Sequence, residues 1–293
     1  MKPARLRRFR EWLIEKAILL SGVFSIVFVL LIFLFLLREG LSLFRNESVL
    51  DFLFGKSWYP ISEPPGFGIL PLILGSLLVT LGAAAISVPI GLAAALFIAE
   101  IAPGRLKEVL KIGIELLAAI PSVVIGFIGM ITLGPWIKSL FGIPTGLTAL
   151  TGSVTLAFMA MPTIVSIAED AVTAVPRQYR EAAVAMGATQ WQTTWRIVAR
   201  AARPGMVAAV MLGIGRVIGE TMAVMMVTGN AAMIPTSMLQ PVRTLTATIA
   251  AEMGESVQGG AHYAALFAIG IVLFLITFLI NGVADLYLHR SKR

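Results

Sequence analysis

An arginine and a glutamate stand four residues apart inside an otherwise uncharged stretch. Arg216 and Glu220 are the only charged residues between positions 205 and 229. A continuous helix would place both on one face, with Arg216 about 16 Å from the start of that stretch. An unpaired arginine at such a depth in a membrane costs at least about 2.5–3.5 kcal/mol, so the pair should face protein or water.

A guanidinium presents forked donors that match the oxygens of a phosphate. We therefore expect Arg216 to line an anion pathway, with Glu220 holding it or gating it. A site that bound the ion too tightly would not release it, which favours a gate over a permanent binding site. The alternative is an ion pair between Arg216 and Glu220 that only neutralises itself.

Other reactive groups are scarce. The chain has no cysteine, which excludes disulfides, thiolate metal sites and a cysteine nucleophile. His262 and His289 are too few and too far apart for a metal site. No G-x-x-x-x-G-K-[ST] loop is present, so we expect no ATP hydrolysis by this chain itself and assign no catalytic residue. Gly215 and Gly219 form a small-x-x-x-small pattern that favours close helix packing.

A second candidate site is the basic stretch 176–204, which carries five arginines and one acid. Within a helix, Ala183 and Gly187 would share one face, whose small side chains allow another surface to approach closely. We expect a docking helix between a membrane domain and a partner. The alternative is an amphipathic linker helix with a solvated basic face. The residues of the pattern are Glu181, Ala182, Ala183, Gly187 and Ile197.

This pattern, E-A-A, three residues, G, nine residues, I, resembles the EAA loop of ABC-importer permeases. The resemblance implies that residues 176–204 form a coupling helix seated in a groove of a separate ATP-hydrolysing subunit. ATP would be used by that subunit, and this chain would bind no cofactor. The sequence departs from the family after Ile197, where Ala199 and Arg200 stand in place of the usual Leu-Pro; Pro204 could supply a delayed break.

The composition is that of an integral membrane protein. Of 293 residues, 58% are hydrophobic and 13% charged, with a mean hydropathy of +0.90, whereas soluble domains carry about 25% charged residues. The sequence predicts an all-α polytopic membrane bundle with six transmembrane helices. The net charge of +7 indicates membrane orientation rather than nucleic-acid binding.

The first apolar run, residues 17–37, is uncharged and long enough to cross about 30 Å of hydrocarbon. It is too long for a signal peptide and no small-residue cleavage site follows, so we expect a retained span. The predicted regions are a cytoplasmic basic N-terminus at 1–16, the first span at 17–37, an extracytoplasmic loop at 38–67, a permease core with five further spans at 68–288, and a cytoplasmic tail at 289–293.

Prolines mark the core. Pro71 and Pro89 are expected to divide residues 68–99 into a short interfacial piece and a kinked second span. Trp58 and Tyr59, in the preceding loop, suit either a membrane interface or packing on their own protein. The remaining spans are predicted at 112–136, 146–168, 205–229 and 263–284.

The distribution of Lys and Arg predicts the orientation. Seventeen lie on the side of the two termini, the 2–3 loop and the stretch 176–204, and five lie on the other side. The positive-inside rule therefore places both termini and residues 176–204 in the cytoplasm.

Four segments are similar to phosphate-importer permeases of the PstC type: residues 52–60, 68–103, 115–127 and the run RVIGETMAVMMVTGN at 216–230. The resemblance extends over most of the chain from residue 50. It implies the permease subunit of an ATP-driven importer in the inner membrane of a prokaryote, moving inorganic phosphate by alternating access. Its partners would be a second homologous permease, a dimer of ATP-binding subunits and an extracytoplasmic phosphate-binding protein.

Three alternatives stay open. The chain could be the sister permease of the PstA type, or belong to an importer for another oxyanion. It could be a proton-coupled secondary transporter with Glu220 as the proton carrier, although this leaves the EAA spacing unexplained. It could also be a membrane-embedded enzyme or an assembly scaffold; an enzyme would need a polar constellation, and the sequence offers only Arg216 and Glu220.

Overall fold

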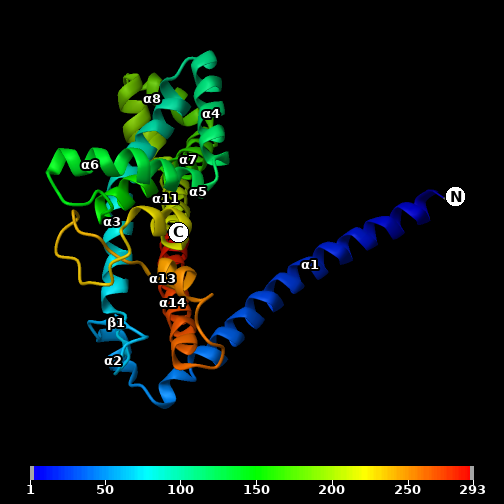
Figure 1. The fold of residues 1–293 in the computed structure, drawn as a ribbon. Coiled ribbons are helices and arrows are strands. Elements are labelled where there is room, and N and C mark those ends of the chain that lie inside the picture. The colour runs from blue at the N-terminus through cyan, green and yellow to red at the C-terminus, as the bar shows by residue number, and fades with distance from the viewer. Residues whose placement is uncertain (1–2, 291–293) are drawn as a thin grey trace.

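The computed structural model describes residues 3–290 and is built almost entirely of helices, which confirms the predicted all-α membrane bundle (Figure 1). Residues 1–2 and 291–293, at the ends of the predicted terminal segments, lie outside the described part. The body is elongated, with α4 and α8 at one end and β1 and α2 at the other (Figure 1). We call these the α8 end and the β1 end.

The elements follow one another with few long connections. The α-helices are α1 (Pro3–Gly40), α2 (Val49–Phe54), α3 (Leu70–Leu96), α4 (Gly104–Ala119), α5 (Ser122–Ile128), α6 (Gly134–Phe141), α7 (Ala149–Thr173), α8 (Arg177–Ala185), α9 (Gln190–Gln192), α10 (Ala199–Ala201), α11 (Arg203–Gly219), α12 (Met222–Val227), α13 (Leu245–Glu252) and α14 (Ala261–Arg290). The strands are β1 (Trp58–Tyr59) and β2 (Gly66–Phe67), and the other helical turns are the 3₁₀ turn η1 (Leu43–Arg45) and the π-helical η2 (Phe97–Ile101), η3 (Gly129–Leu133) and η4 (Thr193–Val198).

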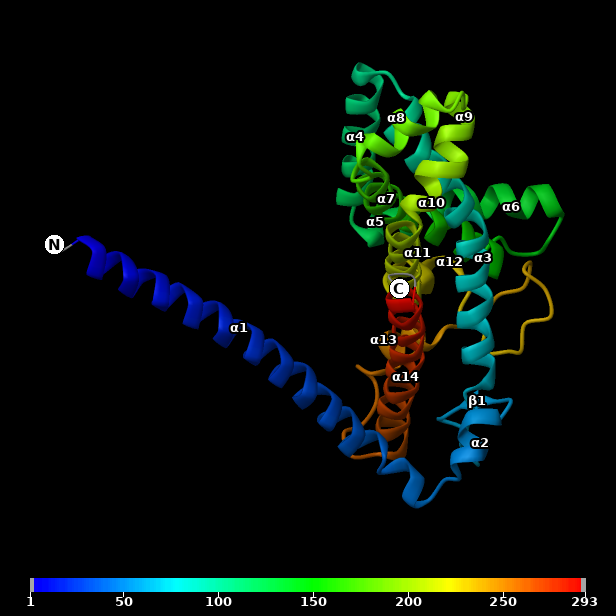
Figure 2. The ribbon, with the colours of Figure 1, turned by 180° about the vertical axis from the view of Figure 1, so that it is seen from behind.

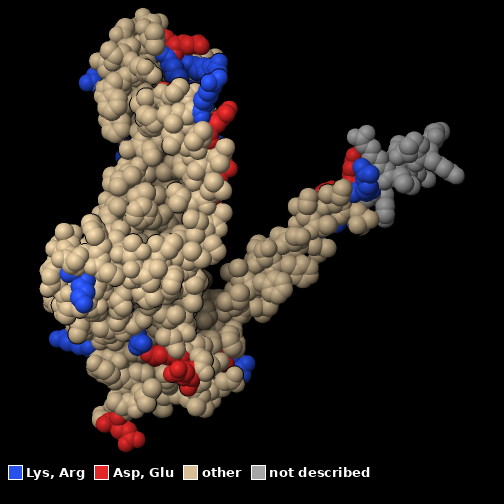
Figure 3. Space-filling model, turned by 45° about the horizontal axis from the view of Figure 1, so that its top comes forward, with Lys and Arg blue, Asp and Glu red and all other residues tan. Residues whose placement is uncertain are grey.

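Five helices of the described chain are long and apolar enough to cross a membrane. A sixth results if residues 190–201 and α11, which meet at a bend of 70°, count as one broken span. Charged side chains gather toward the ends of the body and leave a broad uncharged band between them (Figure 3). The five helices are Arg10–Arg45, Leu70–Ile101, Ser122–Phe141, Ala149–Thr173 and Ala261–Gly282.

The second span is one continuous helix, so the predicted division at Pro71 and Pro89 is wrong. Pro71 lies in the first turn of α3, where a missing N–H removes no helical hydrogen bond, and Pro89 lies inside the helix without ending it. With η2 the helix has 32 residues, or about 48 Å. It therefore exceeds the hydrocarbon thickness of about 30 Å and must tilt or project beyond it.

The third span is displaced from the predicted 112–136. The chain leaves the helical conformation at Ile120, whose ψ is 127°, because the following Pro121 disfavours a helical residue before it. Helix α4 ends there and is separate, and the helix that can span runs from Ser122 to Phe141.

Helix α7 is the centre of the core and packs between α3 and α11. Ile164 of α7 fits against two glycines, Gly91 of α3 and Gly213 of α11, where added side-chain atoms would collide with it. Because glycine has no side chain, these three helices can approach one another closely. The predicted packing role of Gly215 and Gly219 is not found among the described residues, since a Cβ built on either glycine would meet no other described segment within 4 Å.

At the β1 end, a carboxylate ties four segments together. Glu252, at the end of α13, accepts hydrogen bonds from Trp58 Nε1 at 3.1 and 3.2 Å, and from Arg243 Nη1 at 2.6 Å. His262 Nε2 at the start of α14 lies 2.8 Å from the same carboxylate. Trp58 is buried, so it packs on its own protein, whereas Tyr59 is exposed.

Helix α1 projects away from the body and meets it only near its own C-terminal end (Figures 1 and 2). There it packs along α14, with the rings of Phe35 and Phe267 edge to face at 5.4 Å. The most apolar part of α1 buries nothing within the chain. That surface requires lipid or another membrane protein around it.

Candidate coupling surface and membrane arginine

The stretch 176–204 folds into a compact helical loop at the α8 end. Pro176 is the N-cap of α8, where its missing N–H removes no helical hydrogen bond. Thr189 and Gln192 then form a reciprocal capping box that starts α9. The expected docking helix is therefore present as α8, followed by a second limb that leads through η4 into α11.

Gly187 ends the docking helix and is not part of its face. Its φ is +79°, in the left-handed region that glycine adopts without strain. Its N–H donates to Val184 O at 2.9 Å, and the N–H of Ala188 donates to Ala183 O at 3.0 Å. This is a Schellman C-cap. The expectation that Ala183 and Gly187 share a helix face is wrong, because the helix has already ended at Ala185.

The residues of the pattern divide between the two sides of α8. Ala183 is buried, while Glu181 and Ala182 are exposed to solvent, and Ile197 is half-buried in η4. Small, buried Ala183 thus lies on the inner side of α8, which packs against η4 of the second limb, and Glu181 is left on the outer side, available to a partner.

Large apolar side chains accompany Glu181 on the outside. The rings of Trp191 and Trp195 are parallel, with centroids 6.0 Å apart, and Trp191 is 65% exposed. Val184 and Met186 are also exposed. Exposed apolar patches of this kind mark interaction sites, and tryptophan and methionine are enriched in interfaces. Sequence reasoning missed the tryptophans, although their spacing of four residues on a predicted helix would have placed them together.

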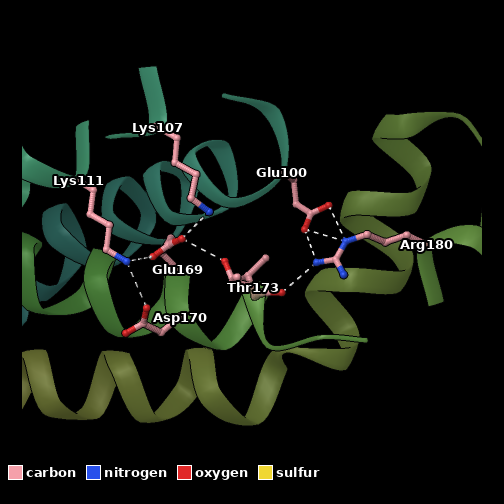
Figure 4. Close-up of polar contacts among 8 residues, drawn as sticks. Glu100, Lys107, Lys111, Glu169, Asp170, Thr173 and Arg180 are labelled. Carbon is pink, nitrogen blue, oxygen red and sulfur yellow. Dashed lines mark hydrogen bonds and ion pairs between the residues drawn. The ribbon is translucent and has the colours of Figure 1, made fainter. Parts of the chain in front are cut away.

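Arg180 holds the docking helix to the membrane bundle (Figure 4). Its Nε lies 3.1 and 3.2 Å from the carboxylate oxygens of Glu100 in η2, and its Nη2 lies 2.5 Å from Glu100 Oε1. Its Nη1 donates to Val175 O at 2.6 Å and its Nη2 to Val172 O at 3.0 Å, at the end of α7. One guanidinium therefore joins α8, α7 and η2.

A second polar cluster ties α4 to α7 beside this contact (Figure 4). The buried carboxylate of Glu169 lies 2.8 Å from Lys107 Nζ and 3.1 Å from Lys111 Nζ, and it accepts a hydrogen bond from Thr173 Oγ1 at 3.0 Å. The hydrogen bond and the charge of Glu169 raise the pKa of Lys111. Lys111 is thus held as a cation against a carboxylate that would be costly to bury alone.

Arg216 and Glu220 do not form the predicted pair. Helix α11 ends at Gly219, and Glu220 has an extended backbone with ψ of 134°. Arg216 Nη1 donates to Thr163 Oγ1 of α7 at 3.2 Å, whereas Glu220 Oε1 accepts from the N–H of Ala223 at 3.2 Å. No ion pair joins the two side chains in the described structure, because the break in the helix removes their common face.

The two residues therefore have different surroundings. Arg216 lies on an exposed face of α11 together with Leu212 and Gly219. Glu220 borders a small cavity whose other polar lining is made of hydroxyl side chains, those of Ser76, Thr80, Thr244 and Thr246. Thr246 Oγ1 also donates to the carbonyl oxygen of Glu220 at 2.8 Å.

A bundle of apolar helices, an arginine within a broken span and an exposed helical loop at one end together define a membrane permease that works with another subunit. The chain belongs to the family of binding-protein-dependent transport system inner membrane components, whose profile matches residues 87–293.

Its relatives agree with this assignment. A probable ABC transporter permease protein, YqgH of Bacillus subtilis, is 42% identical over 84% of this chain and 80% of its own length. The phosphate transport system permease protein PstC of Mesorhizobium japonicum is 39% identical over 82% of this chain and 78% of its own. PstC of Haemophilus influenzae is 35% identical over 91% of both chains.

Solved structures share the fold. A chain of a bacterial alginate ABC transporter superposes with a TM-score of 0.68 at 14% identity, covering 97% of this chain and 96% of its own. A chain of the inward-facing MetNI methionine transporter gives a TM-score of 0.61 at 20% identity, covering 80% of this chain and 100% of its own. The protein is thus an ABC-importer permease of the PstC type, a multi-pass inner-membrane transport component that works with a separate ATPase and a substrate-binding protein.

Proposed function

We propose that this permease carries inorganic phosphate across the inner membrane, in a complex with a second, homologous permease and a dimer of ATP-binding subunits. The observation that carries the proposal is the set of relatives named as phosphate permeases, which match most of this chain and most of their own length. An extracytoplasmic phosphate-binding protein delivers the ion. ATP is used by the partner subunits, and this chain binds no cofactor.

The loop 176–204 docks onto the ATP-binding subunit. Its exposed Glu181, the stacked Trp191 and Trp195 and its excess of arginine give it both apolar area and charge for a protein partner. The excess of Lys and Arg on this side supports a cytoplasmic position for the loop and for both termini. ATP binding in the partner then moves the loop and alternates access to the pathway.

Arg216 lines that pathway. It is a charged residue on an exposed face of a helix within the membrane region, so it needs water, an ion or another protein around it. Gly215 and Gly219 add no side chains to this face of α11, so the second permease can pack closely against it. Glu220 lies apart from Arg216 beside the hydroxyl-lined cavity, where it gates the pathway without neutralising the arginine.

The test is uptake of labelled phosphate by proteoliposomes that contain both permeases, the ATP-binding subunits and the binding protein. We expect uptake that requires internal ATP, is unaffected by collapse of a proton gradient, and is not competed by sulfate. Because a guanidinium fork fits any tetrahedral oxyanion, ATP-dependent uptake of another oxyanion in place of phosphate would overturn the substrate and retain the transport class.

The docking loop is tested in the same complex. Glu181→Lys and Trp191→Ala should each release the ATP-binding subunits on purification in detergent. Arg105→Ala is the matched control, since Arg105 is an exposed cation of α4 with no ion pair among the described residues. If the ATP-binding subunits stay bound to both loop variants, docking through this surface is wrong.

A further inference from the structure

We propose that Arg180 and Glu100 form the joint through which the docking loop moves α3, which makes Arg180 a positioning residue for transport. The inference rests on the proposed docking of residues 176–204. It concerns what happens after docking: how a displacement of the loop enters the membrane bundle.

The contacts of the joint are directional. Arg180 Nε and Nη2 both donate to the Glu100 carboxylate, Nη2 also donates to Val172 O, and Nη1 donates to Val175 O. A lysine carries the same charge but has one nitrogen and no fixed fork, so it cannot make all of these contacts at once. The contact therefore fixes the orientation of α8, beyond supplying an attraction.

Both limbs of the docking loop reach the same residue of η2. Arg180, on the limb formed by α8, binds the side chain of Glu100, and Gln190 Nε2, at the start of α9, donates to the carbonyl oxygen of Glu100 at 3.3 Å. The loop thus contacts Glu100 of η2 through two residues that are ten positions apart in sequence. A displacement of the whole loop must displace Glu100 or break both contacts.

Burial strengthens the joint. The side chain of Glu100 is 9% exposed and that of Arg180 is 25% exposed, so water screens the pair weakly. A buried carboxylate that loses its cation is left uncompensated, which disfavours separation of the two during movement. An open cavity of about 390 Å³ borders the pair, so the loop and η2 have room to move together while the contact persists.

Helix α3 carries the displacement toward the pathway. Glu100 lies in the π-helical η2, which continues α3 without a gap, and π-helical turns occur frequently at functional sites. Toward the other end of the same helix, Ser76 and Thr80 line the cavity that Glu220 borders. A shift or tilt of α3 at Glu100 therefore changes the walls of that cavity.

The neighbouring cluster of Lys107, Lys111 and Glu169 provides a contrast. It is also an ion-paired, buried carboxylate, but it joins α4 to α7 and includes no residue of the loop 176–204 (Figure 4). Breaking it should affect stability without separating the docking loop from α3.

The experiment measures phosphate transported per ATP hydrolysed in the reconstituted complex, together with retention of the ATP-binding subunits. The variants are Arg180→Ala, Arg180→Lys, Glu100→Gln and the exchange Glu100→Arg with Arg180→Glu. Lys107→Met breaks an ion pair of the other cluster, and Arg105→Ala removes an exposed charge. We expect the three single joint variants to keep the ATP-binding subunits and to lose at least tenfold in phosphate per ATP, while both controls stay within twofold of the native ratio.

Each outcome decides between the claims. Partial recovery of the ratio in the exchange variant supports the pair, and a loss in Arg180→Lys supports the fork geometry over charge alone. If Glu100→Gln and Arg180→Lys transport as much phosphate per ATP as the native protein and retain the ATP-binding subunits, the proposed joint is wrong. The proposed docking is then unaffected. If Arg180→Ala does not assemble, these two milder variants still decide. If Glu181→Lys and Trp191→Ala fail to release the ATP-binding subunits, the proposed docking itself fails.

Discussion

The N–H of Ala188 donates to the carbonyl oxygen of Ala183 at 3.0 Å, and Gly187 makes the turn between them at a φ of +79°. A Cβ at Gly187 would meet no atom within 4 Å, so the constraint is the backbone conformation and not space. A left-handed residue other than glycine costs about 1–2 kcal/mol. The requirement for glycine at this place in the docking loop therefore has a local physical cause.

Gly187→Ala should thus weaken the end of α8. It should lower the equilibrium constant for the native loop conformation by a factor of about 5–30. We expect a lower yield of permease carrying bound ATP-binding subunits, and faster proteolysis within residues 176–204. Gly187→Asn should be milder, because asparagine tolerates the left-handed region.

Gly113→Ala is the matched control for that substitution. Gly113 lies in α4 with nothing within 4 Å of an added Cβ and no positive φ, so alanine should be neutral or stabilising there. Equal proteolysis of Gly187→Ala and Gly113→Ala would show that the left-handed turn does not matter.

Arg216→Lys separates charge from geometry in the pathway. Arg216 reaches Thr163 Oγ1 with Nη1, which leaves the other terminal nitrogen of its fork for a bound anion. We expect Arg216→Ala to abolish phosphate uptake and Arg216→Lys to reduce it at least tenfold, with normal assembly. Leu212→Ala, on the same exposed face, should transport normally. If both arginine variants take up phosphate at the native rate, Arg216 has a structural role and does not act on the transported ion.

Whether a feature of this fold can be predicted from the sequence depends on how far apart in the sequence the interacting residues lie. Hydropathy places the spans because burial in lipid acts on whole segments. The end of α11 could not be predicted, since Thr246 binds the carbonyl of Glu220 from 26 residues away. Arg180 and Glu100 are 80 residues apart, and the tertiary packing of α7 against η2 brings them together.

Other features were within reach of the sequence. Gly187 follows a run of helix-forming residues and fits the usual C-cap position of glycine, so its role could have been predicted from spacing alone. Pro71 could have been assigned to a helix start for the same kind of reason. The missed C-cap at Gly187 and the missed start at Pro71 are thus local features, while the Arg180–Glu100 contact and the separation of Arg216 from Glu220 depend on the tertiary fold.

Glycine substitutions distinguish packing inside the chain from packing between subunits. Gly213→Val would collide with Ile164 and should cost about 1–3 kcal/mol through overpacking. We expect a lower melting temperature of the purified permease. A Cβ at Gly215 would meet no other described segment of the chain within 4 Å, so Gly215→Val should leave the melting temperature unchanged and reduce co-purification of the second permease. Normal co-purification would place the second permease elsewhere.

Glu252 should be the main stabilising residue at the β1 end, because three side chains from separate segments converge on its carboxylate. Glu252→Ala leaves Arg243 without its partner. We expect a loss of about 3 kcal/mol, the lower end for breaking a buried ion pair, because Arg243 and Glu252 are 20% and 15% exposed. Thermal unfolding in detergent measures the loss, and fluorescence of Trp58 should report local loosening. Glu255→Ala is the control, because Glu255 is exposed and lines the same open cavity as Glu252 and Trp58 without joining their contacts. Equal melting temperatures for the two variants would refute a stabilising role for the Glu252 contacts.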